Sequence, residues 1–243
     1  MNVIAYYAIH YGAEWLYWSM RSIKDFVDDI VVVYSEAPSH GHGTNATCPD
    51  DREVLKHIAG RFDANWVDIT GSRWEGHHRD EAVSICAGMG ADTILVVDHD
   101  EIWEPEHLRK SLEFVRQSPH RNFLVPFQHY WRSVGWVCHD EAMPVRFHRP
   151  EGEGNAYVPR EYGKVHHYGY AQTSSLIEYK WRIHGHFDEL RPDWYEKTFL
   201  LWIPGMGDVH PTNVDFWTPE KFDRQKLELL IGDHPFYKMD IIP

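Results

Sequence analysis

Short apolar runs alternate with segments of helical spacing along the first hundred residues. The runs predict four buried strands, at 3–9, 29–34, 65–69 and 93–97. Between them, apolar side chains recur every three or four residues, in the sets Leu16, Met20, Ile23 and Val27; Val54, Ile58 and Phe62; and Val83, Cys86 and Ala87. Strands too apolar to face water on either side, separated by such helices, indicate an α/β, Rossmann-like fold. We expect a mainly parallel central sheet with helices on both faces.

The pattern becomes less regular after residue 117. A helix with Pro105 in its first turn is expected to end near Gln117. Longer strands are predicted at 123–131 and 143–149, followed by helices at 174–184 and 194–202. Because no low-complexity stretch could serve as a linker between the halves, the sequence predicts a single domain over residues 1–243.

Composition restricts the class of protein. The 243 residues are 43% hydrophobic, enough for a full-sized core, and 37 acidic against 24 basic residues give a net charge of −13. This charge disfavours nucleic acid and anionic membranes as partners. The apolar runs are far shorter than the ~20 residues of a membrane span. No secretory signal pattern is visible, and Cys48, Cys86 and Cys138 lack the spacing of a zinc or redox motif. We therefore expect a cytoplasmic protein with free thiols.

An acidic cluster directly follows the fourth predicted strand. Asp98, Asp100 and Glu101 come within four residues at the carboxyl end of that strand, where open parallel sheets bind their ligands. Alternation along an extended segment predicts that Asp98 and Asp100 point to one side and Glu101 to the other. Carboxylates this close repel one another, and a divalent cation held by oxygen ligands is the simplest remedy. The alternative is a solvated loop in which an Asp caps the next helix.

Several segments, taken in their order along the chain, resemble a known family. They are Tyr11–Leu16, His78-Arg79-Asp80, Asp98-His99-Asp100-Glu101, His166-His167-Tyr168-Gly169-Tyr170 with the helix that carries Lys180, and the segments beginning at His210 and His234. Together they are similar to family 2-like glycosyltransferases of the GT-A fold, whose Asp-x-Asp motif follows a buried strand. The resemblance implies a metal-dependent enzyme that moves a sugar from a nucleotide-diphosphate donor, a UDP-sugar, to a hydroxyl acceptor. It also implies that residues 1–117 bind the nucleotide sugar and that residues 118–243 face the acceptor.

The resemblance also implies a ligand set for a metal ion. Asp100 would bind the metal directly, Asp98 would bind the ribose hydroxyls or the metal through water, and His167 would complete the coordination. Mixed oxygen and imidazole ligands suit Mn²⁺ at least as well as Mg²⁺. Alternatively, His166 and His167 are ordinary strand residues that face opposite sides.

Two further side chains are candidates for contacts with the nucleotide. Arg79 opens the helix before the acidic cluster, where a charge-assisted hydrogen bond to a diphosphate or base is expected. Its alternative partners are the carboxylates of Glu75 and Asp80. Glu36 ends the second predicted strand, where the resemblance implies nucleoside contacts, although Asp is more usual at that place.

The second half carries the candidates for acceptor binding and catalysis. Trp131 and Trp136 flank a short turn and could offer flat faces to a sugar. Removal of the acceptor's proton needs a carboxylate, for which Asp140 and Glu141 are the first candidates and Asp188 is the next.

Other functions stay open. A metal-dependent phosphoesterase would also use Asp and His ligands on an α/β sheet, although it usually needs two metals and a denser ligand set. A non-catalytic carbohydrate-binding protein would keep the aromatic side chains alone. Glycosylation of modified DNA bases is a narrower variant of sugar transfer, which the charge of −13 disfavours.

Overall fold

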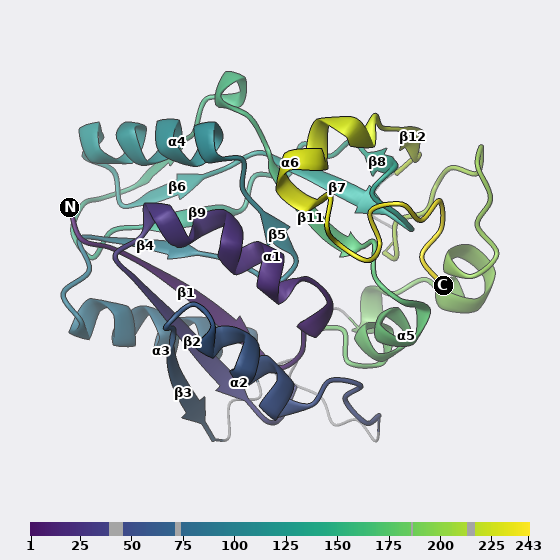
Figure 1. Ribbon diagram of the computed structural model, residues 1–243, viewed down its shortest axis with the longest axis horizontal. Helices are drawn as coiled ribbons and strands as arrows, with labels where there is room; N and C mark the ends of the chain where they lie inside the picture. The colour runs from purple at the N-terminus through teal and green to yellow at the C-terminus, as the bar shows by residue number, and fades with distance from the viewer. Residues whose placement is uncertain (39–45, 71–73, 186, 213–216) are drawn as a thin grey trace. The chain divides into compact units, whose positions relative to one another are not determined.

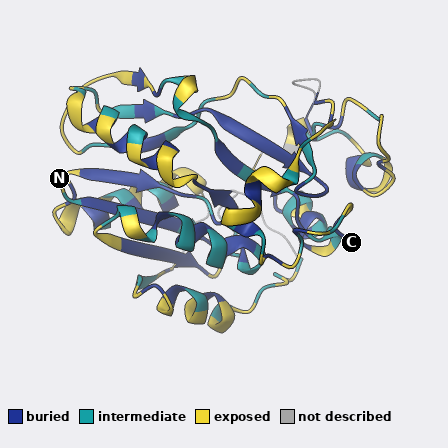
Figure 2. Cartoon of the chain, turned by 45° about the horizontal axis from the view of Figure 1, so that its top comes forward, coloured by how far each residue is buried: buried dark blue, intermediate teal, exposed yellow. Residues whose placement is uncertain are grey.

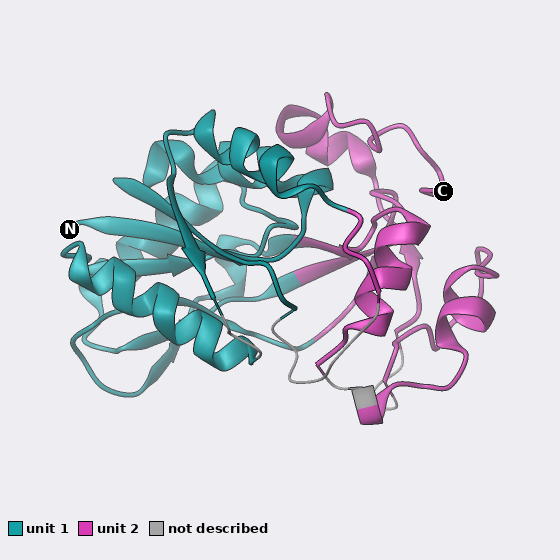
Figure 3. Cartoon of the chain, turned by 90° about the horizontal axis from the view of Figure 1, so that it is seen from below, with its two compact units in different colours: residues 1–41, 50–127, 141–166 teal, residues 42–49, 128–140, 167–243 magenta. Residues whose placement is uncertain are grey.

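The computed structural model describes residues 1–38, 46–70, 74–185, 187–212 and 217–243. The chain forms two compact units, drawn in different colours in Figure 3. Unit 1 consists of residues 1–41, 50–127 and 141–166, and unit 2 of residues 42–49, 128–140 and 167–243. The chain thus passes between the units several times. That residues 1–243 act as one domain, with functional halves 1–117 and 118–243, stays a prediction.

Unit 1 is built around a seven-stranded sheet (Figure 1). Its order is β10 (Asn155–Tyr157), β6 (Asn122–Leu124), β9 (Val145–His148), β4 (Thr93–Val96), β1 (Val3–Ile9), β2 (Asp29–Ser35) and β3 (Asn65–Ile69). The four strands β4, β1, β2 and β3 are parallel to one another, and β10 is parallel to β6. Only β9 is antiparallel to its neighbours. The predicted α/β class with a mainly parallel central sheet is confirmed.

Helices cover both faces of this sheet, as the alternation of side chains along β1 shows. Val3, Ala5, Tyr7 and Ile9 belong to the core that includes side chains of α1 (Ala13–Ile23), α2 (Arg52–Gly60) and α4 (Pro105–Gln117). Ile4 and Tyr6 point the other way, into the core that α3 (Glu75–Gly88) completes. Figure 2 shows the central strands as buried and the outer sides of the helices as exposed. Among the described helices, none is both long and apolar enough to cross a membrane.

Two of the predicted helix faces are correct except for one residue each. Ile58 and Phe62 pack in or against one core, and Val83 and Cys86 in or against the other. In α2 the buried side chains are Leu55 and Ala59, while Val54 is 47% exposed. In α3 the burial falls on Ala82 and Cys86, whereas Ala87 is exposed. Both helices are short of strongly apolar residues, so the spacing alone did not fix their rotation about the axis. The core side is set by the packing against β1, β2 and β3.

The long strand predicted at 123–131 is interrupted, and the next one is shorter than expected. The chain leaves the first sheet after β6 and starts β7 (Phe127–Trp131) in another sheet. The break falls at Val125 and Pro126, because proline has no N–H for a strand ladder. The strand expected at 143–149 is β9, and β5 (Glu101–Ile102) is an additional short strand that begins at the last residue of the acidic cluster.

Unit 2 combines short antiparallel strands with an aromatic core. β8 (Trp136–Cys138) pairs with both β7 and β12 (Glu220–Lys221), and β11 (Val165–Tyr170) is the other neighbour of β7. The predicted helix at 174–184 is α5 (Ser174–Arg182), but at 194–202 there is only a π-helical segment, Tyr195–Phe199; α6 (Glu228–Ile231) follows later. Buried Trp131, Trp194, Trp202 and Trp217 fill the core. The expectation that Trp131 offers a face to a ligand is wrong, because its side chain is fully buried.

Candidate functional site

The acidic cluster forms a tight turn at the carboxyl end of β4. The Glu101 N–H donates to the Asp98 carbonyl at 3.1 Å, so residues 98–101 are not extended. The turn cancels the alternation predicted for an extended segment. As a result, the carboxylates of Asp98 and Glu101 reach the same side chain, Arg146 of β9.

Two arginines hold the carboxylate of Asp98. Arg79 Nη2 donates to Asp98 Oδ1 at 3.0 Å, and Arg146 Nη2 donates to Asp98 Oδ2 at 2.7 Å. Arg79 comes from the second turn of α3 and also donates from Nε to Glu75 at 2.8 Å. Of the carboxylates considered for Arg79 from the sequence, Glu75 is a partner, and Asp98 is a further one that was not expected. The contact of Arg79 with a nucleotide stays a prediction.

Arg146 also satisfies the deeply buried Glu101. Its Nε lies 2.9 Å and 3.0 Å from the two carboxylate oxygens of Glu101, and its Nη2 pairs with the same group. Glu101 is fully buried, and burial raises its pKa to about 8 against the opposing effect of Arg146. The coulombic field of Asp98 raises the pKa of Arg79, and Glu101 and Asp98 raise that of Arg146 against the effect of its burial. The positive charge between Asp98 and Glu101 is thus a guanidinium.

Both arginines line a cavity of about 390 Å³ in unit 1. The other lining residues are aromatic, imidazole or apolar: Tyr6, Val83, Val96, Pro144, Val145 and His148. Guanidinium groups are well suited to phosphate, which they bind through two parallel N–H bonds. The arrangement therefore offers two anchored cations to an anionic group at the end of a central parallel sheet where ligands usually bind.

Asp100 and His99, within the turn, have side chains close to each other. Asp100 is 2% exposed, and its Oδ2 lies 3.7 Å from His99 Nε2. The ring of His99 stands against Gly12, where a Cβ would come within 2.2 Å of its Cγ, and against Tyr11 at 4.9 Å between ring centroids. Gly12 has φ +133, which also favours glycine. This contact gives a physical role to the Tyr11-Gly12 pair in the opening segment.

In unit 2, His167 is joined to Asp140 through His129, a residue that the sequence did not single out. His167 Nδ1 lies 2.9 Å from His129 Nδ1, and His129 Nε2 lies 3.4 Å from Asp140 Oδ2. A hydrogen bond between two Nδ1 atoms needs a hydrogen on one and a lone pair on the other. The three side chains thus form a continuous series of contacts from Asp140 to His167.

The remaining predicted residues are exposed or have partners of their own. Glu36 and Asp188 are exposed. Glu141 pairs with Arg160 at 2.5 Å at the surface of unit 1. His166 bonds through Nε2 to Glu104 at 2.8 Å, and so has a different partner from His167, as adjacent strand residues do. None of these contacts tests a catalytic role, so the assignments of Glu36, Glu141 and Asp188 stay predictions.

The described residues were also compared with what a metal centre needs. Across the described ranges, which omit 39–45, 71–73, 186 and 213–216, no group of three or more His, Cys, Asp or Glu side chains is placed to hold a metal ion. Both carboxylate oxygens of Asp98 already accept from guanidinium groups. The residues as they stand therefore fit an anion-binding arrangement better than a metal centre. The set Asp98, Asp100 and His167 stays a prediction.

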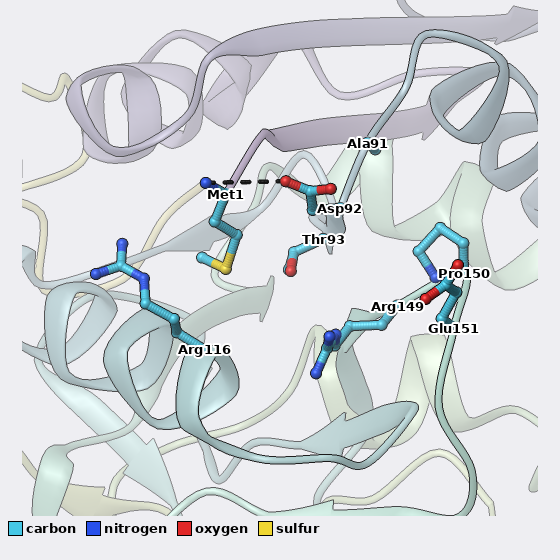
Figure 4. Close-up of a pocket in the computed structure, with 8 residues that line it drawn as sticks. All are labelled: Met1, Ala91, Asp92, Thr93, Arg116, Arg149, Pro150 and Glu151. Atoms are coloured by element: carbon cyan, nitrogen blue, oxygen red, sulfur yellow. Dashed lines mark ion pairs between the residues drawn. The ribbon is translucent and has the colours of Figure 1, made fainter.

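A second cavity in unit 1, of about 340 Å³, lies at the other ends of the strands. It is lined by Asp92 and Thr93 before and at the start of β4, by Arg116 near the end of α4, and by Arg149 after β9 (Figure 4). Parallel sheets bind ligands beyond the carboxyl ends of their strands. We therefore place the candidate site at Arg79, Asp98 and Arg146.

Two cysteines are unreactive thiols near neutral pH, as the lack of a zinc or redox motif in the sequence led us to expect. Burial raises the pKa of both Cys86 and Cys138 to about 12, so neither is a thiolate near neutral pH. Cys48 is also free.

No protein-family model matches the chain, and neither does any curated protein. Solved structures with partial similarity include TarS of S. aureus, at 13% identity and a TM-score of 0.41, over 61% of this chain and 47% of that one. Glucosyl-3-phosphoglycerate synthase of M. tuberculosis matches at 14% identity and 0.36, over 55% and 46%. A UDP-glucose pyrophosphorylase bound to UDP-glucose matches at 11% identity and 0.34, over 60% and 75%. The matched part spans less than half of the TarS and synthase chains.

Proposed function

We propose that this protein is a glycosyltransferase that moves a sugar from a nucleotide-diphosphate donor, a UDP-sugar, to a hydroxyl acceptor. The observation that supports the proposal most directly is the pair of guanidinium groups, Arg79 and Arg146, on either side of Asp98 at the carboxyl end of β4. Both groups border a cavity that is large enough for part of a nucleotide.

The leaving group in such a transfer is a nucleoside diphosphate, which gains negative charge as the sugar departs. Fixed positive groups stabilise that charge without reorganisation during the reaction. Arg146 is 6% exposed and anchored by Glu101, so its position is set before a ligand binds. Arg79 is more exposed, with 30% of its side chain accessible, and can exchange Asp98 or Glu75 for a phosphate oxygen.

The acceptor hydroxyl must lose a proton. In unit 2, the chain Asp140–His129–His167 ends in an imidazole, a group that can take up a proton. In this proposal His167 accepts the proton and Asp140 acts through His129. Dependence on Mn²⁺ or Mg²⁺, with Asp98, Asp100 and His167 as the ligands, is a further part of the proposal, and the same assay tests it.

The test is incubation of the protein with a panel of UDP-sugars, with and without Mn²⁺ or Mg²⁺, and measurement of UDP and inorganic phosphate. We expect UDP release that needs Arg79, so that Arg79→Gln slows it at least tenfold, a loss of about 1.4 kcal/mol of transition-state stabilisation. The matched control is Arg109→Gln, an exposed arginine of α4 paired with Glu106. A phosphoesterase would instead split the diphosphate of the donor into UMP and a sugar 1-phosphate, with inorganic phosphate only after further hydrolysis of these monoesters, and without UDP. Saturable sugar binding with no product from any donor would indicate a non-catalytic carbohydrate-binding protein.

A further inference from the structure

A cavity in unit 2 has the chemistry of a sugar-binding site. Its volume is about 410 Å³. Its walls come from the turn after β7, from the start of β8, from the β12 region and from the last residues of the chain: Ser133, Gly135, Trp136, Pro204, Lys221, Phe222, Arg224, Asp240 and Ile241. None of these residues lines the cavity of unit 1 that holds Arg79 and Arg146, so the two cavities share no side chain.

Trp136 supplies a flat apolar face. Its ring is only partly buried, and it is held edge-on by Trp202 at 5.2 Å between centroids. Phe222 adds a second aromatic side chain to the lining. Because Trp202 belongs to the packed core, the ring of Trp136 is positioned before any ligand arrives. Pyranose rings present C–H faces of this size, which stack on indoles.

Fixed polar groups stand beside the aromatic face. Arg224 donates from Nη1 to the carbonyls of Tyr237 and Met239, at 3.1 Å and 3.3 Å, and its Nη2 pairs with Asp240. The Asp240 side chain is 87% exposed, so it keeps an oxygen for a ligand hydroxyl. An aromatic face next to an anchored arginine and a carboxylate provides both stacking and hydrogen bonds for a polyhydroxylated ring.

The charge of the lining points to an anionic sugar. Lys221 and Arg224 outweigh Asp240 by one positive charge, in a chain whose net charge is −13. Lys221 is the cross-strand partner of Trp136, with its Nζ 5.9 Å from the indole centroid. Among the residues that the structure describes, no carboxylate forms an ion pair with Lys221. Its ammonium group is therefore available to a negative group on a ring that stacks against Trp136.

We propose that this cavity binds an acidic pyranoside, with one face of the ring on Trp136 and a carboxylate or phosphate of the sugar on Lys221. The inference needs no sugar transfer and would hold if the protein were only a carbohydrate-binding protein. Conversely, its failure would leave the proposed reaction at the arginine pair untouched.

The test is a fluorine NMR titration of the whole protein labelled with 5-fluorotryptophan, in which Trp136→Phe assigns the Trp136 resonance. The ligands are methyl glucuronide, glucose 6-phosphate and the neutral methyl glucoside. We expect the Trp136 resonance to shift on titration and methyl glucuronide to bind about fivefold more tightly than the glucoside at low salt, as an ion pair worth about 1 kcal/mol would give.

Lys221→Gln should remove the preference for the acidic sugar and keep the binding of the glucoside. Lys197→Gln, an exposed lysine of unit 2 that pairs with Asp193 and does not line the cavity, is the control and should change neither affinity. A preference for glucose 6-phosphate alone would identify phosphate as the recognised group. A Trp136 resonance that no sugar shifts, or equal affinities for the acidic and neutral sugars, would overturn the proposal.

Discussion

Gly169 lies directly beneath the ring of His167. The two residues are two apart on β11 and share one face of the strand, and a Cβ added to Gly169 would come within 2.6 Å of His167 Cε1 and 3.0 Å of Nε2. The missing side chain therefore gives the imidazole the space in which it reaches His129 at 2.9 Å. The His-Tyr-Gly-Tyr pattern is thus a steric arrangement around one ring.

Replacing Gly169 by alanine should displace that ring. We expect Gly169→Ala to lower the free energy of unfolding by about 1–3 kcal/mol, as overpacking does. The double variant Gly169→Ala/His167→Ala should recover much of the loss, because the clashing ring is gone. Urea denaturation measures both. Gly60→Ala in α2, where nothing lies within 4 Å of the new Cβ, is the control. Additive losses in the double variant would contradict the steric account.

The sheet could be predicted from the sequence because each of its central strands is a run of apolar residues. Such a run is visible in a few consecutive residues and needs no knowledge of distant contacts. The rotation of α2 could not, since Val54 and Leu55 are equally apolar and only packing decides between them. Pro126 did mark the break between β6 and β7, but the apolar run across it concealed the signal.

The candidate site was predictable only in part, because some of its residues come from distant parts of the chain. The position of Asp98 follows from the strand before it, whereas its partner Arg146 lies 48 residues further along the chain and arrives through the antiparallel pairing of β9 with β4. Nothing local distinguishes Arg146 from other arginines. The link between His167 and Asp140 was equally hidden, although the alternation in β7 placed His129 on a defined face.

Arg146 should be important for stability because it is the hydrogen-bond partner of the buried Glu101. Arg146→Met leaves the fully buried carboxyl group of Glu101 without that partner and removes one of the two cations of Asp98, and we expect a loss of about 1–3 kcal/mol in the free energy of unfolding. Adding Glu101→Leu removes the stranded group and should restore much of that loss. Chemical denaturation of the two variants measures the difference. The exposed pair Arg109–Glu106 is the control, since Arg109→Met should cost less than about 1 kcal/mol.

The three carboxylates predicted as catalytic differ in their surroundings, so they can be distinguished. Asp140→Asn removes the charge that orients His129, and we expect the rate of UDP release to fall by about 10²-fold or more. Glu141→Gln breaks only a surface pair with Arg160, and Asp188→Asn alters an exposed residue, so both should retain the wild-type rate. If Glu141→Gln or Asp188→Asn is the inactive variant, the proton acceptor is not the histidine chain.

Metal dependence can be tested on the two adjacent histidines. If His167 and Asp100 bind Mn²⁺, calorimetry should show that His167→Ala and Asp100→Ala each weaken Mn²⁺-dependent UDP binding about tenfold or more. His166→Ala is the matched control, because His166 bonds to Glu104 instead. Equal UDP affinity with and without Mn²⁺ in the wild-type protein would contradict the metal site. The negative charge of the diphosphate would then be neutralised by Arg79 and Arg146.

The stability of the protein should depend on pH through His107. This side chain in α4 is 1% exposed beside Trp103, and burial lowers its pKa to about 4, with smaller effects from His166, Glu104 and Lys110. In the unfolded chain a histidine takes up its proton near pH 6.5. Between pH 6.5 and 4 the unfolded state therefore binds more protons than the folded one, so the free energy of unfolding falls as the pH falls.

The contribution of His107 to this fall is at most about 3 kcal/mol, and it is fully present as stability above pH 6.5. His107→Phe keeps a ring against Trp103 and removes the titration. We expect the difference between the wild-type and variant unfolding free energies, measured by urea denaturation, to shift in favour of the variant as the pH is lowered from 6.5 to 4. His57→Phe, on the exposed side of α2, should leave the pH profile almost unchanged. Parallel wild-type and His107→Phe profiles would show that this histidine is protonated as readily in the folded protein as in the unfolded chain.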